Sequence, residues 1–436
     1  MKPIQVGLLG IGTVGRGTFE VLARNHEEIE RRAGRGIRIT KVADLDVERA
    51  RQIVGSHATV VANGFDVIND PEIDVVVELI GGYGIAKELI LKAIAAGKHV
   101  VTANKALIAV HGTEIFAAAS KAGVIVAFEA AVAGGIPIIK ALREGLTANR
   151  IQWIAGIING TTNFILSEMR DKGLSFENVL AQAQALGYAE ADPTFDIEGI
   201  DAAHKATIMS ALAFGIPVQF DKAFVQGITQ LQPQDIRYAE QLGYRIKLLG
   251  ITKRVGSGVE LRVHPCLVPS KCLIANVEGA MNAVMVHADA VGTTLYYGKG
   301  AGSEPTASAV IADLVDIARL SSVDAKHRVP FLAFQSDQMS DLPVVPMSAV
   351  VTSYYLRMRV ADQAGVLARV TGLLAHHDIS IDAVLQRAAV EGESQTDLII
   401  LTHDCLESNM AQALSEMQSD TSVLAPIVQI RKEELS

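Results

Sequence analysis

The densest group of polar residues in this chain lies between Gly187 and Lys205, where the sequence reads GYAEADPTFDIEGIDAAHK. Asp201 and Lys205 are four positions apart, so they would share one face of a helix. The next residues, ATIMSALAFG, are almost all apolar, which indicates that most of this helix is buried. A buried lysine can pass a proton to or from an alkoxide or carbonyl oxygen while hydride moves at carbon. We therefore predict acid–base chemistry at Lys205, with an exposed ion pair as the alternative.

Acidic residues crowd the same segment. Glu190, Asp192 and Asp196 precede the Asp201–Lys205 pair, and acids outnumber bases there. A surplus of negative charge suits a ligand that carries a positive charge. We expect these acids to hold an ammonium group of the substrate.

A glycine-rich turn follows the first apolar stretch, IQVGLL, which is typical of a buried strand. Gly10, Gly12 and Gly15 form the pattern G-x-G-x-x-G just before a helical stretch. In that setting the first glycine makes a tight turn, the second admits a pyrophosphate, and the third lets the helix pack on the strand. The helix N-terminus then faces the anion. The pattern predicts a dinucleotide site, with an unliganded glycine turn as the alternative; the residues concerned are Gly10, Gly12, Thr13, Val14 and Gly15.

The preferred dinucleotide depends on Asp44, which ends the second predicted strand, IRITKVAD. An acid at this point can accept hydrogen bonds from the adenosine ribose and would repel a 2′-phosphate, which favours NAD over NADP. The spacing from Gly15 to Asp44 is longer than usual for the motif. Lys41 or Arg49 could still hold a phosphate, so NADP remains open. The alternative role for Asp44 is that of a turn or capping acid.

A second candidate lysine, Lys105, comes directly after the apolar stretch HVVTA. Ligands bind at the carboxyl ends of the strands in doubly wound sheets, so Lys105 could lie near the nicotinamide and the substrate. Thr102 and Asn104 share that position and are also expected to contact the cofactor. The alternative for Lys105 is a solvated surface lysine.

Three kinds of structure must position these residues. Residues 1–135 alternate apolar strands with helices, which predicts an α/β, doubly wound Rossmann-type domain with a parallel sheet. Residues 136–335 begin with a strand that ends at Asn159-Gly160, continue with helices at 161–172, 176–186 and 198–214, and show strands from 244 to 298. They predict an α+β catalytic and dimerisation domain. A helix at 306–320, within residues 300–325, is expected to return to the first domain.

The last part of the chain has its own pattern. Residues 336–348 contain two prolines and are expected to form a linker. Residues 349–436 then show the order βαββαβ, including the strands ISIDAVLQRA and QTDLIILTHD and the helix GVLARVTGLLAHHD between the first two strands. This order is typical of a ferredoxin-like domain.

Composition excludes several classes of protein. The 436 residues carry a net charge of −9, and aromatic residues make up 5%, so nucleic-acid binding is not expected. Apolar stretches are interrupted by charges or glycines, and the start of the chain does not read as a signal peptide. Three cysteines with no CxxC pair indicate reduced, buried thiols. We expect a cytoplasmic protein without membrane spans.

Several motifs together carry a family resemblance. GIGTVG, TANK, EAAVAGGIP, INGTTN, GYAEADPTFDIEGIDAAHK and GAGSEPTASAV resemble, in order and spacing, the motifs of homoserine dehydrogenase over residues 1 to about 330. The resemblance implies reversible, NAD(P)-dependent conversion of L-aspartate 4-semialdehyde and L-homoserine in threonine, methionine and isoleucine biosynthesis. One departure is ADLD at 43–46, where many NADP-preferring relatives place an arginine.

The resemblance also implies roles for individual residues. Lys205 would be the acid/base lysine with Asp201 as its partner, and Lys105 would lie at the junction of nicotinamide and substrate. The substrate would be bound by Glu190, Asp196, Gly160 and Thr161, and Gly302 lies in a glycine run that returns to the cofactor. A sodium site of the kind found in some members would use one carboxylate and main-chain carbonyls, which suit a hard cation; its residues would be Glu129, Val132, Gly134 and Ile136.

The C-terminal segment DQAGVLARVTGLLAHHDISI resembles an ACT domain. Such domains imply pairing between subunits and binding of an amino acid, here with L-threonine as the expected effector. Asp362, Gly365 and Val366 lie in the first strand-to-helix turn, where backbone N–H groups can bind a carboxylate. The alternative is a dimerisation module without a ligand. A homodimer or homotetramer is expected.

Two other functions remain as rivals. One is a different Rossmann enzyme with an ACT domain, acting on a 2-hydroxy acid through a histidine. The other is a non-catalytic amino-acid sensor that kept the cofactor fold. The lysine among acids at Lys205 favours the dehydrogenase over the first rival, and activity with homoserine would decide against the second.

Overall fold

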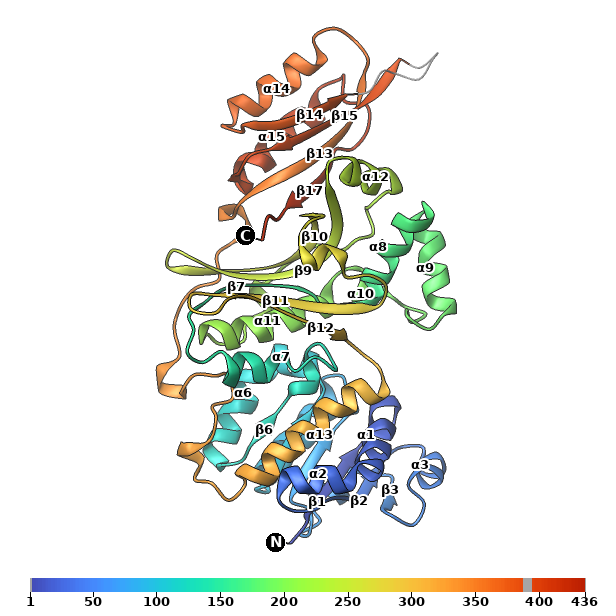
Figure 1. Ribbon diagram of the computed structural model, residues 1–436, viewed down its shortest axis with the longest axis vertical. Helices are drawn as coiled ribbons and strands as arrows, with labels where there is room; N and C mark the ends of the chain where they lie inside the picture. The colour runs from blue at the N-terminus through green and yellow to red at the C-terminus, as the bar shows by residue number, and fades with distance from the viewer. Residues whose placement is uncertain (1, 387–393, 436) are drawn as a thin grey trace.

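Three regions follow one another along the long axis of the computed structural model, which describes residues 2–386 and 394–435. Figure 1 shows an N-terminal α/β region at one end, a central region built on long strands, and a C-terminal region at the other end. The order of these regions is the one predicted from the sequence.

The N-terminal region is built on six parallel strands in the order β3-β2-β1-β4-β5-β6. This is the order of a dinucleotide-binding fold, in which the strand order reverses between β1 and β4 while all strands stay parallel. The strands are short and apolar because helices bury both faces of the sheet. The predicted doubly wound domain is confirmed. The strands are β1 (Ile4–Leu9), β2 (Ile37–Ala43), β3 (Thr59–Val61), β4 (Val75–Glu78), β5 (His99–Thr102) and β6 (Val126–Ala127).

One helix of this region comes from much later in the chain. Helix α13 (Ser303–Leu320) lies beside α1 (Thr13–Arg24) in Figure 1, and the Ser303 hydroxyl donates a hydrogen bond to the Thr13 carbonyl at 2.8 Å. The chain therefore returns to the start of α1 after the central region. The remaining helices are α2 (His26–Ala33), α3 (Val47–Val54), α4 (Gly64–Ile68), α5 (Gly84–Ala95) and α6 (Lys105–Ala122).

The central region is a sheet of long strands in the order β12-β11-β7-β9-β10, with antiparallel pairing throughout this stretch. Helix α11 packs against it and is buried from Asp201 to Phe214, as its apolar sequence predicts. The elements are α7 (Ile138–Lys140), β7 (Ile151–Ile157), α8 (Gly160–Lys172), α9 (Phe176–Ala185), α10 (Thr194–Ile197), α11 (Ile200–Phe214), β8 (Phe224–Val225), α12 (Pro233–Gln241), β9 (Tyr244–Val255), β10 (Gly258–Pro269), β11 (Met281–Ala288) and β12 (Gly292–Lys299).

The C-terminal region has the predicted βαββαβ order. Alternate residues of its first strand, such as Tyr354, Leu356 and Met358, face the two helices and form a separate core. The predicted strand ISIDAVLQRA corresponds to β14, and its last two residues, 387 and 388, lie outside the described residues. The elements are β13 (Val351–Ala361), α14 (Val366–His376), β14, β15 (Gln395–Thr402), β16 (Cys405–Leu406), α15 (Glu407–Ser419) and β17 (Val428–Lys432), with β14 spanning Ile381–Gln386.

The two later sheets are continuous, which the sequence did not predict. Strand β17 pairs with β13 on one side and, in parallel, with β10 on the other, where Cys266 faces Arg431 and Leu267 faces Lys432. The eleven-stranded sheet therefore extends from the central region into the C-terminal one. The segment expected to be a linker lies along the start of β10, because Val259 N–H donates to Pro343 O and Val345 N–H to Val259 O, both at 2.9 Å.

Two further expectations concern the whole chain. Within residues 2–386 and 394–435, no helix is both long and apolar enough to cross a membrane. The three cysteines are unpaired, as predicted. Cys266 and Cys405 are buried, whereas Cys272 is partly exposed, so the expectation of buried thiols is wrong for that residue.

Candidate active site

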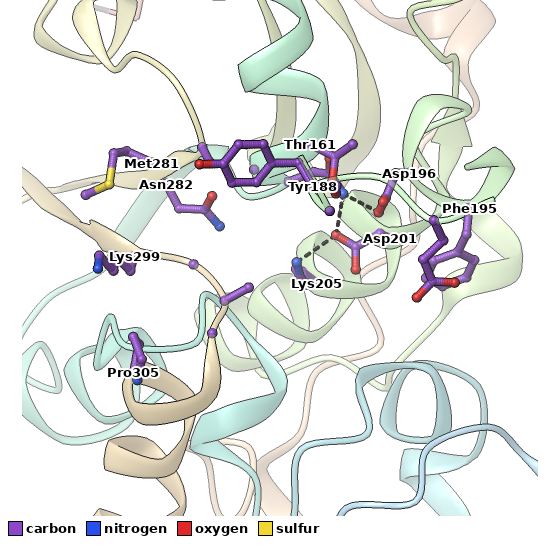
Figure 2. A pocket seen from close by; sticks show the side chains of 18 of the residues that line it. Thr161, Tyr188, Phe195, Asp196, Asp201, Lys205, Met281, Asn282, Lys299 and Pro305 are labelled. Atoms are coloured by element: carbon purple, nitrogen blue, oxygen red, sulfur yellow. Dashed lines mark hydrogen bonds and ion pairs between the residues drawn. The ribbon is translucent and has the colours of Figure 1, made fainter. Parts of the chain in front are cut away.

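A cavity of about 1290 Å³ lies between the central region and the N-terminal region, where β12 leads into α13. Figure 2 shows side chains from α8, α10, α11 and the start of β11 converging on it. The structure thus brings together all of the catalytic and substrate-binding residues predicted from the sequence. The predicted residues that line the cavity are Lys105, Gly160, Thr161, Glu190, Asp192, Asp196, Asp201, Lys205 and Gly302.

Two lysines share one carboxylate at the floor of this cavity. Asp201, in the first turn of α11, accepts a hydrogen bond from Lys205 Nζ at 2.6 Å and pairs with Lys105 Nζ at 2.9 Å through its other oxygen. Lys205 Nζ also donates to the Ile158 carbonyl at 2.7 Å. The side chains of Asp201 and Lys205 are only 3% and 10% exposed. The sequence-based prediction of a buried pair is therefore correct, and Lys105 joins it from the start of α6.

Burial and charge set the protonation of this cluster. Burial lowers the pKa of Lys205, and the nearby Asp201 offsets this only in part. Burial would by itself raise the pKa of Asp201, but the two lysines hold it well below its usual range. Burial also opposes the charge of Lys105, yet Asp201 and the neighbouring acids raise the pKa of that lysine above its ordinary value. Lys205 is therefore the member of the cluster that can most readily give up its proton.

Asn159 was not singled out as a functional residue, although the sequence analysis placed it at the end of a strand. Its amide nitrogen donates to Asp201 at 2.9 Å and to Asp196 at 2.7 Å, while its oxygen caps α8 by accepting from Thr162 N–H at 2.8 Å. Burial, together with the charge of Asp201, raises the pKa of Asp196. Asn159 thus joins two acids that the sequence placed in one motif, and the Asn-Gly turn was the signal that could have identified it.

The acids at the mouth of the cavity are exposed. Glu190 and Asp192 line it without being buried, as does Tyr188 on the same loop. The Thr161 hydroxyl donates to the Tyr188 carbonyl at 2.7 Å and so holds this loop against α8. The loop presents negative charge to the cavity, as expected for a site that receives an ammonium group.

Asn282 is a second cavity residue that the sequence analysis did not identify. It is 1% exposed, and its side-chain oxygen has no hydrogen-bond partner among the described residues. A Cβ atom on Gly300 would come within 1.9 Å of its nitrogen, and one on Gly160 would lie 3.6 Å from its oxygen. Asn282 therefore lies between the start of α8 and the glycine run. A bound ligand could satisfy its oxygen by donating an N–H group, and no sequence motif marks this residue.

The glycine turn has the geometry expected of a dinucleotide site. Gly10 has φ +89°, a backbone conformation that residues other than glycine rarely adopt. A Cβ atom on Gly15 would come within 2.2 Å of the Gly10 carbonyl oxygen, so glycine is also required there. A Cβ on Gly12 would meet nothing within 4 Å, so open space lies in front of the turn. Thr13 and Val14 begin α1 directly behind it. These features leave room for a pyrophosphate at the N-terminus of α1.

Asp44 supports this turn from the end of β2. One carboxylate oxygen accepts from Ile11 N–H at 2.7 Å and the other from Asp46 N–H at 2.9 Å. Lys41 forms an ion pair with Asp70, which directs its charge away from Asp44, whereas Arg49 is exposed. Asp44 is therefore both a turn acid, as the alternative prediction had it, and a carboxylate next to the glycine loop.

Thr102 and Asn104 do not line the cavity. Their side chains instead contact the end of β4 and the loop that follows it. The Thr102 hydroxyl donates to Glu78 at 2.6 Å, and Glu78 accepts from the N–H groups of Ile80 and Gly81. Asn104 caps α6 and donates to the Gly82 carbonyl at 2.7 Å. Glu78, which the sequence analysis did not identify, thereby fixes the loop after β4 and links it to the end of β5.

The predicted sodium ligands lie where the chain enters the central region. Glu129 is 1% exposed, and its carboxylate accepts from the N–H groups of Ile139 and Lys140 at 2.9 and 2.8 Å. Burial, reinforced by the neighbouring Asp313, raises the pKa of Glu129 to about 8. A cation beside this carboxylate would favour its ionised form. The backbone from Val132 to Ile136 follows it directly, and Gly134 adopts φ +51°.

The predicted effector turn lies in the C-terminal region, between β13 and α14. Gly365 is the N-cap of α14 with φ +90°, and Val366 is buried. The Asp362 N–H donates to the Ser394 carbonyl at 2.9 Å and the Val366 N–H to Gln363 at 3.4 Å. The three residues share one turn, as predicted, and two of their N–H groups already have partners within the protein.

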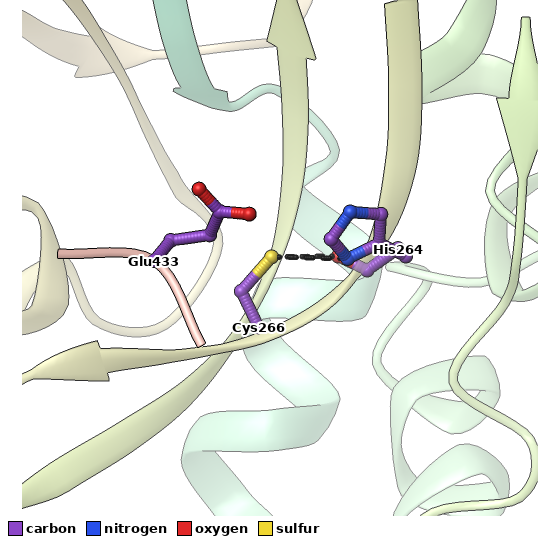
Figure 3. A group of neighbouring side chains, drawn as sticks. All are labelled: His264, Cys266 and Glu433. Atoms are coloured by element: carbon purple, nitrogen blue, oxygen red, sulfur yellow. Dashed lines mark hydrogen bonds between the residues drawn. The ribbon is translucent and has the colours of Figure 1, made fainter. Parts of the chain in front are cut away.

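A separate polar cluster lies between β10 and β17 and is shown in Figure 3. The potential ligand atoms of His264, Cys266 and Glu433 lie within 4.8 Å of one another. However, Arg262 donates to His264 Nε2 at 2.8 Å and pairs with Glu433, and His264 Nδ1 lies 3.0 Å from the Pro265 carbonyl. Burial lowers the pKa of His264 and raises that of Cys266, so both are neutral. Because partners within the protein occupy both ring nitrogens, this cluster joins two strands and does not offer a metal site.

Comparison with known protein families gives matches to three family models. A model described as homoserine dehydrogenase matches residues 137–315, and one described as the NAD binding domain of homoserine dehydrogenase matches residues 10–129. An ACT domain model matches residues 354–420.

Comparison of the whole chain with known proteins points to the same family. The chain is 60% identical to the homoserine dehydrogenase of Pseudomonas aeruginosa and 58% identical to that of Neisseria gonorrhoeae, with 100% of both chains covered in each case. A crystal structure of a homoserine dehydrogenase from Thiobacillus denitrificans is 63% identical, with a TM-score of 0.96 over 100% of this chain and 99% of that one. A hyperthermophilic archaeal homoserine dehydrogenase in complex with NADPH has a TM-score of 0.63 and 25% identity over 74% of this chain and all of that one.

Proposed function

The chain belongs to the homoserine dehydrogenase family of NAD(P)-dependent oxidoreductases, and from this we propose that it interconverts L-homoserine and L-aspartate 4-semialdehyde with Lys205 as the acid/base group. The observation that carries the assignment of Lys205 is its buried pair with Asp201 at the floor of the cavity. The carbon-bound hydroxyl of the substrate must lose a proton as hydride leaves the same carbon. Lys205 is the buried group whose pKa favours accepting that proton.

The residues around Lys205 fit distinct roles. Asp201 stays ionised and orients both lysines, and Lys105 reaches the same carboxylate from the cofactor side of the cavity. Glu190 and Asp196 would hold the substrate ammonium, with Gly160 and Thr161 forming the adjacent wall. The nicotinamide cofactor supplies the hydride acceptor when bound. The lysine cluster then lies between the substrate's ammonium site and the glycine run that contains Gly302.

The direct test measures NAD(P)H formation from L-homoserine at alkaline pH by absorbance. We expect turnover by the intact chain and none with a 2-hydroxy acid lacking the amino group. Turnover of the hydroxy acid alone would favour the first rival, and no turnover of either compound would favour the amino-acid sensor. A Lys205→Ala protein that retained full turnover would remove the role given to Lys205.

NAD is proposed as the preferred cofactor. The Asp44 carboxylate lies at the glycine turn, where it would repel a 2′-phosphate, and Lys41 is paired elsewhere. The archaeal homoserine dehydrogenase was solved in complex with NADPH, so both cofactors are to be compared for this chain. Steady-state kcat/KM with NAD and with NADP, under the same conditions, provides that comparison.

A sodium ion is proposed at Glu129, with main-chain carbonyls of Val132, Gly134 and Ile136 as further ligands. Burial raises the pKa of Glu129 to about 8, so its two backbone N–H donors only partly stabilise the charge of the buried carboxylate. A nearby cation would stabilise that charge further. Oxygen-only ligands suit a hard cation. The Ile136 carbonyl already accepts from Ile138 N–H at 2.8 Å, and its second lone pair would have to serve the ion.

Residues 349–436, joined through residues 336–348, are proposed as a regulatory domain. An amino-acid effector fits the ACT match, and L-threonine, an end product of the pathway, is the proposed inhibitor, with Asp362, Gly365 and Val366 as its candidate turn. We expect millimolar L-threonine to lower the rate, and an unchanged rate would contradict this. A homodimer or homotetramer is also proposed, and light scattering on the purified chain would determine which.

A further inference from the structure

Asn282 reaches the active-site cavity from β11 without a hydrogen-bond partner for its amide. Figure 2 shows the amide directed from β11 into the cavity, whose lining includes this residue. Its oxygen is one of the fully enclosed side-chain atoms that lack a partner within residues 2–386 and 394–435, whereas its nitrogen is not fully enclosed. The same part of the chain provides no acceptor for that nitrogen. Asn282 is therefore a free donor at the cavity wall, held by a residue that is 1% exposed.

An unpaired amide destabilises the folded protein at this position. A buried polar group without a partner carries its full desolvation cost, whereas an apolar side chain of the same shape carries none. Most buried polar groups in proteins are hydrogen-bonded, so each exception needs an explanation. The next residues of the strand, Ala283 and Val284, are apolar and fully buried. An amide at position 282 therefore points to a ligand that accepts a hydrogen bond when it is bound.

The two ends of the amide face different sides of the cavity. A Cβ atom on Gly300 would come within 1.9 Å of the Asn282 nitrogen, so no side chain fits there. On the other side, the oxygen lies 3.6 Å from the position that a Cβ atom on Gly160 would take. The nitrogen thus faces the glycine run, residues 298–302. The oxygen faces the start of α8, which belongs to the proposed substrate wall.

The glycine run connects Asn282 to the dinucleotide turn. The Gly135 N–H donates to the Lys299 carbonyl at 3.0 Å, which fixes the start of the run. Just after its end, the Ser303 hydroxyl donates to the Thr13 carbonyl at 2.8 Å, so the run leads to the turn at the start of α1. A dinucleotide with its pyrophosphate at that turn must extend past the run for its nicotinamide to reach a substrate at the lysine cluster. The nitrogen of Asn282 faces the same stretch of chain.

The nicotinamide ring carries one polar substituent, a carboxamide whose oxygen accepts hydrogen bonds. The uncharged amide of Asn282 suits such an uncharged acceptor. The substrate carboxylate is a poorer match, because Asn282 has no positive charge and turns its oxygen toward the substrate wall. The substrate ammonium and hydroxyl are already assigned, to Glu190 with Asp196 and to Lys205. The carboxamide is therefore the acceptor that fits the nitrogen of Asn282.

We propose that Asn282 is a cofactor-binding residue whose Nδ2 donates a hydrogen bond to the carbonyl oxygen of the nicotinamide carboxamide. Because the carboxamide lies at one edge of the ring, holding it fixes which face of the ring is turned toward the substrate. Asn282 thus positions the hydride acceptor, while the lysine cluster positions the substrate. The inference rests on the proposed function only for the place of the substrate beside Lys205.

Binding measured without turnover tests the proposal. Calorimetry on the intact chain gives dissociation constants for NAD, for its thionicotinamide analogue, in which sulfur replaces the carboxamide oxygen, and for ADP-ribose, which lacks the nicotinamide. Asn282→Leu removes both amide atoms and should raise the NAD dissociation constant about threefold to tenfold, the effect of one hydrogen bond between uncharged groups. The thio analogue should lose less affinity, since sulfur is a weak acceptor, and ADP-ribose should stay within about twofold.

Stability and a matched variant separate binding from packing. The urea midpoint of Asn282→Leu should equal or exceed that of the parent chain, because an unpaired buried amide is replaced by an apolar side chain. If the leucine prevents folding, Asn282→Ala is used for the same binding series. Asn178→Leu, the same change at an exposed residue of α9, should leave all three dissociation constants within about twofold. In steady-state kinetics, Asn282→Leu should raise KM for NAD and leave KM for L-homoserine near its parent value.

Several outcomes would overturn the proposal. An unchanged NAD dissociation constant in Asn282→Leu would remove the bond. An equal loss for the thio analogue would place the contact elsewhere on the ring, and an equal loss for ADP-ribose would place it on the ribose or the glycine run. A raised KM for L-homoserine with unchanged NAD binding would assign Asn282 to the substrate.

These measurements also separate the role of Asn282 from the reaction proposed above. Selective loss of NAD binding in Asn282→Leu supports the role of Asn282 even if the parent chain does not oxidise L-homoserine, in which case the proposed function is wrong. If the parent chain oxidises L-homoserine and Asn282→Leu binds all three ligands as the parent does, the proposed function is correct and the role of Asn282 is wrong.

Discussion

Two buried charge clusters in this molecule differ in what surrounds them. At the active site, Asp201 is shared by Lys105 and Lys205, and all three line a cavity of about 1290 Å³. Between β10 and β17, by contrast, Arg262 is shared by Glu260 and Glu433 and is 3% exposed. The first cluster has more cations than acids and opens to a ligand, whereas the second is enclosed by strands. Asp201 and Lys205 are about as buried as Arg262 and its two acids, so access to a cavity is what distinguishes a catalytic cluster from one that holds two regions together.

The strongest test of this comparison is to remove Lys205. Lys205→Ala should lower kcat by about 10²–10⁴, the usual contribution of a positioned acid/base group. The loss of stability should be small, because Asp201 keeps its ion pair with Lys105. Turnover and urea unfolding measure the two effects. Lys247 serves as a control, since it is also buried and bonded to a backbone carbonyl, that of Val277 at 2.6 Å, but does not line the cavity. Lys247→Met should keep kcat, and a similar loss there would mean that burial alone explains the Lys205 result.

The cluster of Arg262, Glu260 and Glu433 should show the opposite pattern. Arg262→Ala leaves Glu260 and Glu433 buried without their cation, which should cost about 3–5 kcal/mol of unfolding free energy. The KM and kcat of the folded protein should stay near those of the parent chain. Urea unfolding monitored by circular dichroism gives the first quantity, and steady-state kinetics below the transition gives the others. A loss of kcat without a loss of stability would assign this cluster a role in catalysis and contradict the comparison.

Glu129 provides a third case, a buried acid whose carboxylate contacts only backbone donors. Its folded pKa of about 8 lies above the unfolded value of 4.5, so the folded state binds the extra proton between these limits. Stability without added sodium should therefore fall as pH rises from about 4.5 to 8. The melting temperature in Tris or phosphate prepared without sodium measures this, and Glu129→Gln should flatten the dependence.

Asp313 must be separated from Glu129 in that experiment, because burial raises its pKa from 3.8 to about 6 and it accepts the Glu129 N–H. Asp313→Asn should remove only the part of the slope below pH 6. Sodium chloride should raise the melting temperature more at pH 8 than at pH 5.5, relative to a large organic cation. An equal rise at both pH values would exclude an ion on Glu129.

The smallest effect is expected at Asp44, which is only half-buried. Asp44→Asn keeps an oxygen for Ile11 N–H but removes the charge that would repel a 2′-phosphate. The ratio of kcat/KM for NADP to that for NAD should rise several-fold, about 1 kcal/mol, as expected for two charges in a hydrated setting. Arg49→Gln is the matched change on the exposed side of the same turn. If it lowers NADP use instead, Arg49 and not Asp44 sets the preference.

The catalytic cluster was predictable because its residues lie close together in the sequence. The i, i+4 spacing of Asp201 and Lys205 and the apolar turns after them were enough to indicate a buried pair on one helix face. The glycine turn was predictable for the same reason, since each of its glycines has a local role. Asn282 could not be found in this way, because its importance comes from its contact with Gly300, just after the neighbouring strand β12, and not from a pattern in its own strand.

The architecture was predictable region by region but not across regions. Periodicity gave the doubly wound sheet, the central strands and the βαββαβ order. The pairing of β10 with β17 joins residues far apart in the sequence, and nothing in either strand specifies the other as its neighbour. Arg262, His264 and Glu433 therefore had no visible role before the structure placed them together.

The β10–β17 pairing also has a consequence for how the protein is made. Strand β10 leaves the ribosome well before β17, so its edge at Cys266 and Leu267, next to the stretch paired with β8, stays open while the C-terminal region is synthesised. An open strand edge can pair with another chain, and such pairing leads to aggregation. Arg262 lacks Glu433 during the same interval. A chain cut near Ser348 would leave this short stretch of β10 unpaired, so we expect such a protein to aggregate more readily than the whole chain.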